Sequence, residues 1–425
     1  MQRLILNTIF TRGVSTFLNF LVALLIARHT GPAIKGEVTL LVTTIWFLVF
    51  FSNILGGQAL VYLLPRNKLE LVVVPGYLWS LFITALSYFI LRYTHLLNAI
   101  HIPSIVVLGF LSSVTSIHQT VLLAQKKISK ANMLQLVPLS IQVAGILVCF
   151  YAFKINDAYA YIYSSLAAFT IGAVVSFFMV RKSIMFSYFL SDFTFTDLKV
   201  SLRYGFLYHF VEVFQLLNLR YYFYQLGIQQ GSRYLGVYSI GISILEAVWL
   251  IPRSINTVHY VSTSNSSETD KEKLRTVQLL KISTVICFIA LLLIWAAPPG
   301  VYTSVFGPGF KDVKHSMRFL APGILIYSPF FIVSSFYLGI GKYSKLIIAG
   351  ASGFLSLVFF SWVLIPKYVM SGAGLAATLS FTIATGILLT GFIREMKLPL
   401  KVFLINSSDL NTVTQWLKPA NKLNG

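Results

Sequence analysis

Long apolar runs recur along almost the whole of this 425-residue chain, and they constrain its fold more than any other feature. A run of roughly 18 or more apolar residues can cross about 30 Å of hydrocarbon as a helix. Hydrophobic residues make up 56% of the chain, and only 11% is charged, against roughly 25% in soluble proteins. A chain of this composition buries its apolar surface in a bilayer, so we predict an all-α integral membrane protein.

The apolar runs predict about twelve transmembrane helices joined mostly by short loops. The first run contains Arg12 and Asn19 and has no small-residue cleavage site, so it is interpreted as a membrane helix and not as a signal peptide. The approximate limits of the twelve helices are 5–28, 36–64, 71–92, 103–125, 131–153, 158–180, 204–226, 235–261, 277–297, 316–340, 345–365 and 371–393.

The distribution of lysine and arginine predicts the orientation of the chain, because these residues favour cytoplasmic loops. With the N-terminus inside, the inner segments carry about twenty basic residues and the outer segments about eight. Both termini are therefore expected in the cytoplasm. Much of the net charge of +20 is explained by this topology, so it does not indicate a nucleic-acid partner.

The connection at 183–203 is mixed polar and aromatic, and it separates six predicted helices from six. We expect an N-terminal six-helix lobe at 1–182, a cytoplasmic linker at 183–203, a C-terminal six-helix lobe at 204–393 and a cytoplasmic tail at 394–425.

The two halves also resemble each other in sequence. "FLNF" around Asn19 is echoed by "LLNL" around Asn218, and "KISK" from Lys127 by "KYSK" from Lys342. At an offset of 200, four pairs match: Gly36 with Gly236, Thr39 with Ser239, Thr43 with Ser243, and Asn53 with Arg253. Because each half has six helices, both enter the membrane from the same side. The pattern predicts two parallel repeats related by an axis along the membrane normal.

Four helices carry polar residues at helical spacing, and so present a polar face. They are the helices predicted at 5–28, 36–64, 204–226 and 235–261. We expect these faces to line a shared, water-accessible cavity between the halves.

Charged residues deep in these helices are candidates for function, because a charge at the bilayer centre costs about 2.5–3.5 kcal/mol. The candidates are Arg12, Arg220, Arg253, Glu212 and Glu246. One interpretation is internal pairing, such as Glu212 with Arg220 or Glu246 with Arg12. The other is a role in the cavity, and the two interpretations are compatible.

Several classes of protein are disfavoured. No G-x-x-x-x-G-K-[ST] motif indicates ATP hydrolysis, and no His/Cys cluster has metal-binding spacing. Cys149 and Cys287 fall inside predicted helices and are expected to be packing residues. No large external loop is present to hold a catalytic site, so we expect a transporter without a metal or organic cofactor and not an enzyme.

The stretches "TGPAIKGEVTLL", "YLGVYSIGISILEAVWLIPRSI" and "IPKYVMSGAGLAATLSF" resemble bacterial polysaccharide biosynthesis proteins. These are the O-antigen and repeat-unit flippases of the multidrug/oligosaccharidyl-lipid/polysaccharide (MOP) exporter superfamily. The resemblance extends over most of the chain, to about residue 395.

The resemblance implies two six-helix lobes forming a V around a central cavity, and alternating access. The implied substrate is a polyprenyl-pyrophosphate-linked oligosaccharide, moved from the inner to the outer leaflet of the bacterial cytoplasmic membrane. Membrane lipids, a polysaccharide polymerase and chain-length machinery are the further partners it implies. Arg12 and Arg253 match cavity arginines of related flippases by helix and face. Members of this family often carry an acid just after an arginine in the seventh helix, which is predicted here at 204–226. In this chain Arg220 is followed by Tyr221 and Tyr222 instead.

Arginine suits this substrate because its guanidinium makes charge-assisted, often bidentate bonds to phosphate. The predicted substrate-binding residues of the cavity are Arg12, Asn19, Asn53, Arg220, Ser243 and Arg253. Glu246 and Glu212 are the candidates for binding H⁺ or Na⁺ if transport is ion-coupled. The alternative function is a drug or metabolite/cation antiporter of the same superfamily, in which acids should dominate the cavity.

Overall fold

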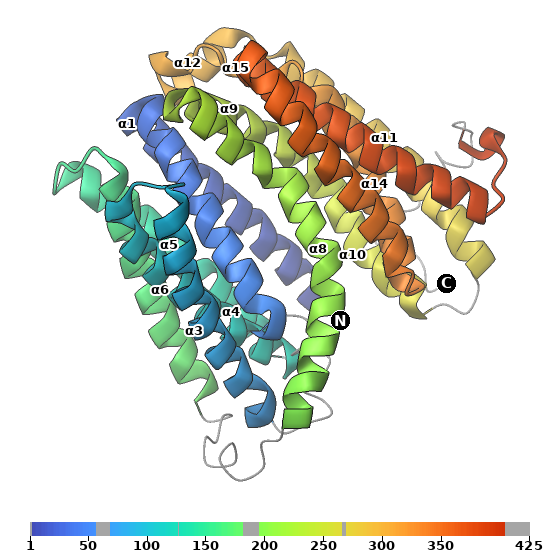
Figure 1. The fold of residues 1–425 in the computed structure, drawn as a ribbon, viewed down its shortest axis with the longest axis horizontal. Coiled ribbons are helices and arrows are strands. Elements are labelled where there is room, and N and C mark those ends of the chain that lie inside the picture. The colour runs from blue at the N-terminus through green and yellow to red at the C-terminus, as the bar shows by residue number, and fades with distance from the viewer. Residues whose placement is uncertain (1, 57–68, 126, 182–194, 266–268, 404–425) are drawn as a thin grey trace. The chain divides into compact units, whose positions relative to one another are not determined.

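The computed structural model describes residues 2–56, 69–125, 127–181, 195–265 and 269–403, and this part of the chain contains helices and turns but no strand (Figure 1). The predicted end of the second helix at 57–64, the linker residues 183–194 and the tail beyond 403 lie outside it.

The first half contains α1 (Gln2–Gly56), α3 (Leu69–Thr94), the 3₁₀ turn η1 (Ala99–His101), α4 (Ile102–Ala124), α5 (Ile128–Tyr151) and α6 (Ala158–Val180). The second half contains α8 (Phe195–Gln230), α9 (Ser232–Glu246), η2 (Ala247–Trp249), α10 (Leu250–Asn265), α11 (Thr269–Ala296), α12 (Pro299–Phe306), η3 (Pro308–Phe310), α13 (Val313–Met317), α14 (Ala321–Gly339), α15 (Tyr343–Glu395) and η4 (Leu400–Phe403).

The two longest helices are each broken once. In α1 the break is at Gly31 (φ 78°, ψ −178°), a backbone conformation that glycine adopts without strain, and Pro32 follows it. In α15 the break is at Val369 (φ 52°, ψ −122°). Counting each arm separately, and α9 with α10 as one helix, the described chain has a helix for every one of the twelve predicted spans. The predicted all-α membrane fold is confirmed.

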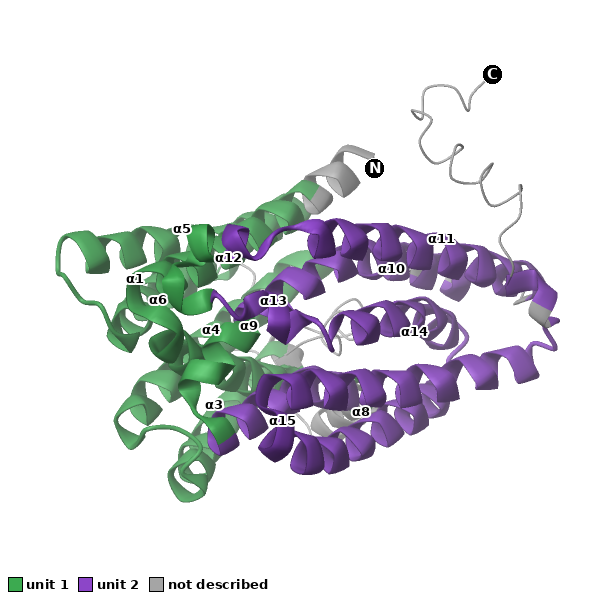
Figure 2. Ribbon diagram, turned by 90° about the horizontal axis from the view of Figure 1, so that it is seen from above, with its two compact units in different colours: residues 1–212, 230–239, 303–310 green, residues 213–229, 240–302, 311–425 purple. Residues whose placement is uncertain are grey.

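Contacts divide the chain into two compact units (Figure 2). Unit 1 comprises residues 1–212, 230–239 and 303–310, and unit 2 comprises residues 213–229, 240–302 and 311–425. The start of α9, the second half of α12 and η3 thus pack with the first half of the chain. The lobe boundaries near 182 and 204 stay a prediction.

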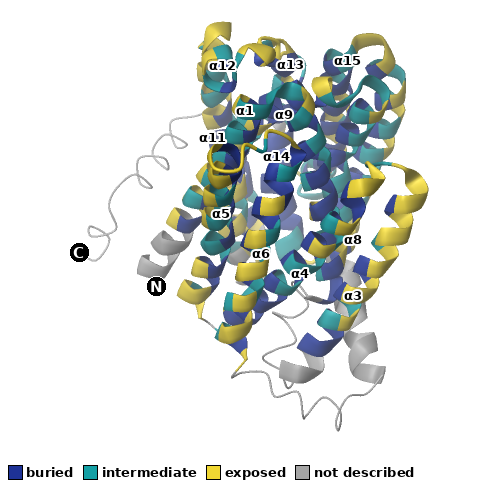
Figure 3. Cartoon of the chain, turned by 90° about the vertical axis from the view of Figure 1, so that its left-hand side faces the viewer, coloured by how far each residue is buried: buried dark blue, intermediate teal, exposed yellow. Residues whose placement is uncertain are grey.

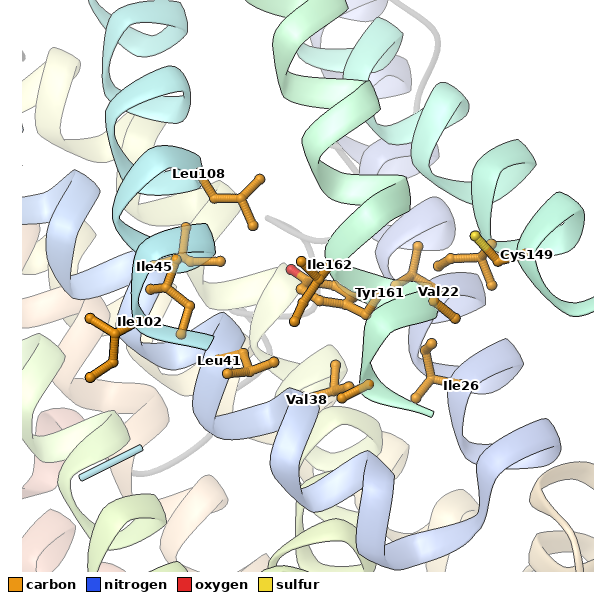
Figure 4. Close-up of a cluster of buried hydrophobic side chains, with 14 of the residues drawn as sticks. Val22, Ile26, Val38, Leu41, Ile45, Ile102, Leu108, Cys149, Tyr161 and Ile162 are labelled. Carbon is orange, nitrogen blue, oxygen red and sulfur yellow. The ribbon is translucent and has the colours of Figure 1, made fainter. Parts of the chain in front are cut away.

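The core of unit 1 is an apolar cluster to which both arms of α1 contribute (Figure 4). Val22 and Ile26 come from the first arm, Val38 and Leu41 from the second, and all four are buried. Cys149 lies in the same cluster, and Cys287 is buried in unit 2; both thiols are free. The cysteines are therefore packing residues, as their positions in the sequence indicated.

Large apolar side chains cover much of the outer surface of the helices, where Figure 3 shows many exposed residues. Phe89 is 68% exposed, Leu293 70% and Trp362 73%. Soluble monomers rarely expose contiguous apolar surface of this kind, whereas a bilayer covers it. The exposed side chains thus agree with the spans predicted from hydropathy.

Trp249 anchors the core of unit 2. It is fully buried against the rings of Tyr327, Phe331 and Phe381, and its Nε1–H donates to the carbonyl oxygen of Ile324 at 2.8 Å. A buried tryptophan with its polar atom satisfied combines a large packing area with a fixed orientation. It fixes η2 against α14 and α15.

We expect Trp249→Ala to lower the melting temperature strongly, because truncating a buried tryptophan costs about 3–5 kcal/mol. Trp362→Ala is the matched control, since Trp362 is 73% exposed and should tolerate truncation. Thermal unfolding in detergent micelles measures both. Equal melting temperatures for the two variants would contradict the role assigned to Trp249.

Candidate functional site

The sequence-predicted site residues are distributed over both units. Arg12, Asn19, Asn53 and Glu212 belong to unit 1, whereas Arg220, Ser243, Glu246 and Arg253 belong to unit 2.

The helix that carries Ser243, Glu246 and Arg253 is irregular in its middle. The α-helical segment α9 ends at Glu246, the 3₁₀ segment η2 follows, and α10 begins at Leu250. Pro252 explains the irregularity, because it lacks an N–H and its ring clashes with the carbonyl four residues earlier. That carbonyl, of Val248, accepts a weak bond from the Cys287 thiol at 3.8 Å. A mid-helix 3₁₀ stretch often marks a functional hinge.

Glu246, at the start of this irregularity, is bound by the guanidinium of Arg220 on α8. Arg220 Nη1 donates to Glu246 Oε1 at 2.7 Å, and Nη2 donates to Oε2 at 2.9 Å. Arg220 is buried, with 8% of its surface exposed, and its Nη1 also donates to the carbonyl oxygen of Leu219 at 2.9 Å. The internal-pairing interpretation therefore holds for Glu246, but its partner is Arg220 and not Arg12.

Arg253 lies seven residues beyond Glu246, about two helical turns away. Its guanidinium carbon lies 5.4 Å from the ring centroid of Trp249 and 5.2 Å from that of Phe331. Aromatic faces attract a guanidinium at these distances without neutralising its charge. The two rings orient Arg253 while the residue stays exposed. Ser243, one turn before Glu246, is also exposed.

The candidates of unit 1 are mostly accessible as well. Arg12 and Asn19 are exposed on the first arm of α1, and the side-chain amide of Asn19 donates to the carbonyl oxygen of Ser15 at 2.8 Å. Asn53 is half-buried, and its backbone carbonyl accepts from His209 Nε2 at 2.8 Å. Glu212 is half-buried on α8.

Two repeat-matched glycines meet where α1 and α9 cross within unit 1. A Cβ built on Gly36 would overlap the carbonyl oxygen of Ser232, and one built on Gly236 would overlap that of Pro32. Ser232 and Pro32 are themselves 200 residues apart, so the contact of Gly36 with Ser232 is equivalent to the contact of Gly236 with Pro32. This is the isologous geometry of a two-fold relation. The crossing supports the repeat inferred from the sequence, because equivalent positions of the two halves touch.

Lys35 is buried at the same crossing of α1 and α9. Lys35 was not identified as a site residue from the sequence, which placed Lys35 in the loop between the first two predicted helices. Its ammonium is buried and donates to Thr39 Oγ1 at 2.8 Å and to Ser239 Oγ at 3.2 Å. The hydroxyl of Thr39 in turn donates to Ser239 Oγ at 3.1 Å. Thr39 and Ser239 lie on the helices predicted at 36–64 and 235–261, two of the four whose polar faces are predicted to line the cavity, and here the two side chains are in direct contact.

Within the described ranges, no group of three or more His, Cys, Asp or Glu side chains is arranged to hold a metal ion.

No family model and no curated protein sequence matches this chain. Solved structures do match it. An inward-facing multidrug resistance MATE family transporter of the MOP superfamily aligns with a TM-score of 0.76 and 12% identity, covering 90% of this chain and 94% of that one. The lipid II flippase MurJ, in an inward closed conformation, aligns with a TM-score of 0.70 and 17% identity, covering 98% and 92%.

A MOP superfamily transporter from Pyrococcus furiosus, for which a reversed polarity of the binding pocket suggests a different function, aligns with a TM-score of 0.66 and 15% identity, covering 93% of this chain and 95% of that one. The chain has the fold of MOP superfamily transporters. Because this fold serves both the MATE transporter and the flippase MurJ, the fold alone does not select a substrate. The choice between these substrates has to be argued from the chemistry of the site residues.

We expect the Arg220–Glu246 pair to behave as one unit in a double-mutant cycle. Arg220→Met or Glu246→Leu alone should destabilise the protein by about 3–5 kcal/mol, because each leaves a buried charge unpaired. The double variant should recover most of the loss, since two apolar side chains leave no charge behind. Melting temperatures of the wild type, the two single variants and the double variant in detergent measure the coupling between the two side chains.

The control for this cycle is the pair of Lys342 and Glu395, in which the lysine side chain is 47% exposed. Exposed pairs contribute about 0–1 kcal/mol, so truncating this one should change little. Additive effects of Arg220→Met and Glu246→Leu would show that the two side chains do not depend on each other.

Proposed function

We propose that this protein flips a polyprenyl-pyrophosphate-linked oligosaccharide from the inner to the outer leaflet of the bacterial cytoplasmic membrane by alternating access. The substrate would be a repeat unit of a surface polysaccharide. One observation carries the proposal: both carboxylate oxygens of Glu246 are bonded to Arg220, while Arg253 on the same helix as Glu246 is an exposed residue.

The charges of this region favour an anionic substrate. Arg220 and Glu246 form a neutral pair, and Arg253 is an exposed cation about two helical turns beyond Glu246. Arg12 adds a second exposed cation in unit 1. A pyrophosphate cannot cross hydrocarbon unaided because burying its charge is prohibitive, and guanidinium groups supply the compensating bonds. Asn19, Asn53 and Ser243 would offer hydrogen bonds to sugar hydroxyls.

A drug or metabolite/cation antiporter is the second candidate, since the MATE transporter shares the fold. Such a transporter needs an acid that can accept a cation. Glu246 is occupied on both oxygens by Arg220, which leaves Glu212 as the other acid among the sequence candidates. The pairing therefore argues for the anionic substrate.

The pairing also changes the roles that we propose for two residues. Arg220, predicted from the sequence as a substrate ligand, is proposed instead to hold Glu246. Glu246 and Glu212 remain the proposed sites for H⁺ or Na⁺, and Glu246 could accept a proton only as Arg220 withdraws. The polymerase, the chain-length machinery and the cytoplasmic position of both termini remain predictions.

We expect Arg253→Ala to abolish transport of the lipid-linked oligosaccharide by the reconstituted protein. Arg253→Lys should rescue it only in part, because an ammonium lacks the planar fork that binds phosphate in a bidentate manner. Arg233→Ala is the control, since Arg233 is also exposed but lies at the start of α9. Normal transport by a well-folded Arg253→Ala protein would exclude Arg253 as the phosphate ligand.

Alternating access predicts that the crossing of α1 and α9 separates during transport. In a background without Cys149 and Cys287, Thr39→Cys with Ser239→Cys should form a disulfide that stops transport until it is reduced. Gln142→Cys with Ser165→Cys is the control pair, because these side chains bond at 2.7 Å between α5 and α6, within one half of the chain. If the oxidised Thr39/Ser239 pair transports at the normal rate, the crossing does not open.

A further inference from the structure

A groove with a volume of about 420 Å³ lies between α1 and α5 in unit 1. Thr11 contributes from α1, and the α5 side is formed by positions 129, 132, 133, 136, 137, 140 and 141. These positions follow the three- and four-residue spacing of a single helix face. Twelve residues of helix correspond to about 18 Å, so the groove is elongated along the helix axis. Its form suits an extended chain better than a compact solute.

The opposite face of α5 explains why the groove wall is fixed. That face packs tightly on α6: a Cβ on Gly172 would lie 2.8 Å from Pro138 Cγ, and one on Gly145 would lie 2.9 Å from Ser164 Cβ. Gln142 Nε2 also donates to Ser165 Oγ at 2.7 Å. Helix α5 is therefore held against α6, and its groove-lining face is left to α1 and to whatever enters between them.

The groove is apolar along most of its length and polar at the start of α5. Met133, Leu136, Val137 and Ile141 line the apolar part, with Ser140 as a single hydroxyl among them. Thr11, Ser129 and Asn132 lie at the other end. A lining that changes from polar to apolar along one helix face is complementary to an amphiphile whose head group lies at the start of α5.

The charge around the polar end is positive. Lys127 and Lys130 flank Ser129 and are exposed, and Arg12 directly follows Thr11 and is exposed as well. Helix α5 contains no Asp or Glu, and the only acid of α1 is Glu37, in its second arm. The N-terminal end of α5 adds the partial positive charge of its helix dipole. The head group that suits this end is a multiply charged anion.

We propose that this groove holds the prenyl chain of the lipid-linked substrate, with its pyrophosphate at the end formed by Ser129, Lys130 and Arg12. This inference rests on the proposed function and adds the path of the chain to it. A pyrophosphate carries more negative charge than the single phosphodiester of a phospholipid, so the three cations Arg12, Lys127 and Lys130 favour it. The chain remains in an apolar environment while the head group is captured.

Photocrosslinking tests the position of the chain. A benzophenone amino acid is introduced at Met133, which is 50% exposed, or at Val148, which is 48% exposed on the same helix but beyond the groove. The protein is reconstituted in vesicles of phosphatidylethanolamine and phosphatidylglycerol with a radiolabelled polyprenyl pyrophosphate that carries no glycan. We expect capture of the label at Met133 and not at Val148, and competition by unlabelled polyprenyl pyrophosphate.

Two outcomes of this experiment would overturn the proposal. Equal capture at Met133 and Val148 would show only that both positions face lipid. Capture at Met133 that added phosphatidylglycerol displaces as well as polyprenyl pyrophosphate would assign the groove to bulk phospholipid.

Filling the groove tests its role in transport. Val137→Trp should reduce the initial rate of flipping by about tenfold, equivalent to about 1.4 kcal/mol. Leu147→Trp, an exposed position on α5 past the groove, should leave the rate unchanged. Equal melting temperatures of the two variants would show that the loss of rate is not a loss of folding.

The same assays separate failure of the groove proposal from failure of the proposed function. If the wild type flips the substrate, Arg253→Ala stops it and Val137→Trp does not slow it, the groove proposal is wrong and the function stands. If the wild type does not flip the substrate at all, the proposed function is wrong. Competable capture at Met133 would then support the groove as a prenyl-pyrophosphate site, and its absence would reject the groove too.

Discussion

The bidentate bond between Arg220 and Glu246 determines how the other charges of this region can act. In hydrocarbon neither side chain could remain alone, because an unpaired charge there costs several kcal/mol. Two apolar residues could replace such a pair with little loss of stability, so the pair is not explained by stability alone. Its effect on the site is to remove the negative charge of Glu246. Arg253, near the rings of Trp249 and Phe331, is then an exposed cation two helical turns beyond the neutral pair.

A second constraint comes from the relation between the two halves. A two-fold relation brings each residue near the axis toward its own counterpart, so a bulky side chain there would meet an equally bulky one. Glycine at both Gly36 and Gly236 removes this conflict and lets the backbones touch. Lys35 breaks the symmetry, because its counterpart is Leu235. One buried ammonium can bond to the hydroxyls of Thr39 and Ser239, whereas two facing each other would repel.

The apolar runs were sufficient to predict the twelve helices, because hydrocarbon requires each span to satisfy its own backbone. The break at Gly31 and Pro32 was also readable from residue type, but the break at Val369 was not, since valine disfavours its backbone conformation. The partner of Glu246 could not be predicted. Arg220 is 26 residues away on another helix, and pairing depends on the rotation of both helices, which periodicity does not determine.

The burial of Lys35 could not be predicted from the sequence either. A lysine next to a glycine at the end of an apolar run is typical of a loop, and only the crossing of a distant helix buries it. The sequence therefore identifies which charged residues are unfavourable in a membrane. Tertiary contacts determine which of them gain an ion pair or hydrogen bonds. Among the site candidates, Glu246 is bonded to Arg220 on both oxygens, and Arg12 and Arg253 are exposed. Since MATE transporters and MurJ share this fold, we infer that substrate choice depends on the side chains exposed on it and not on the helical framework.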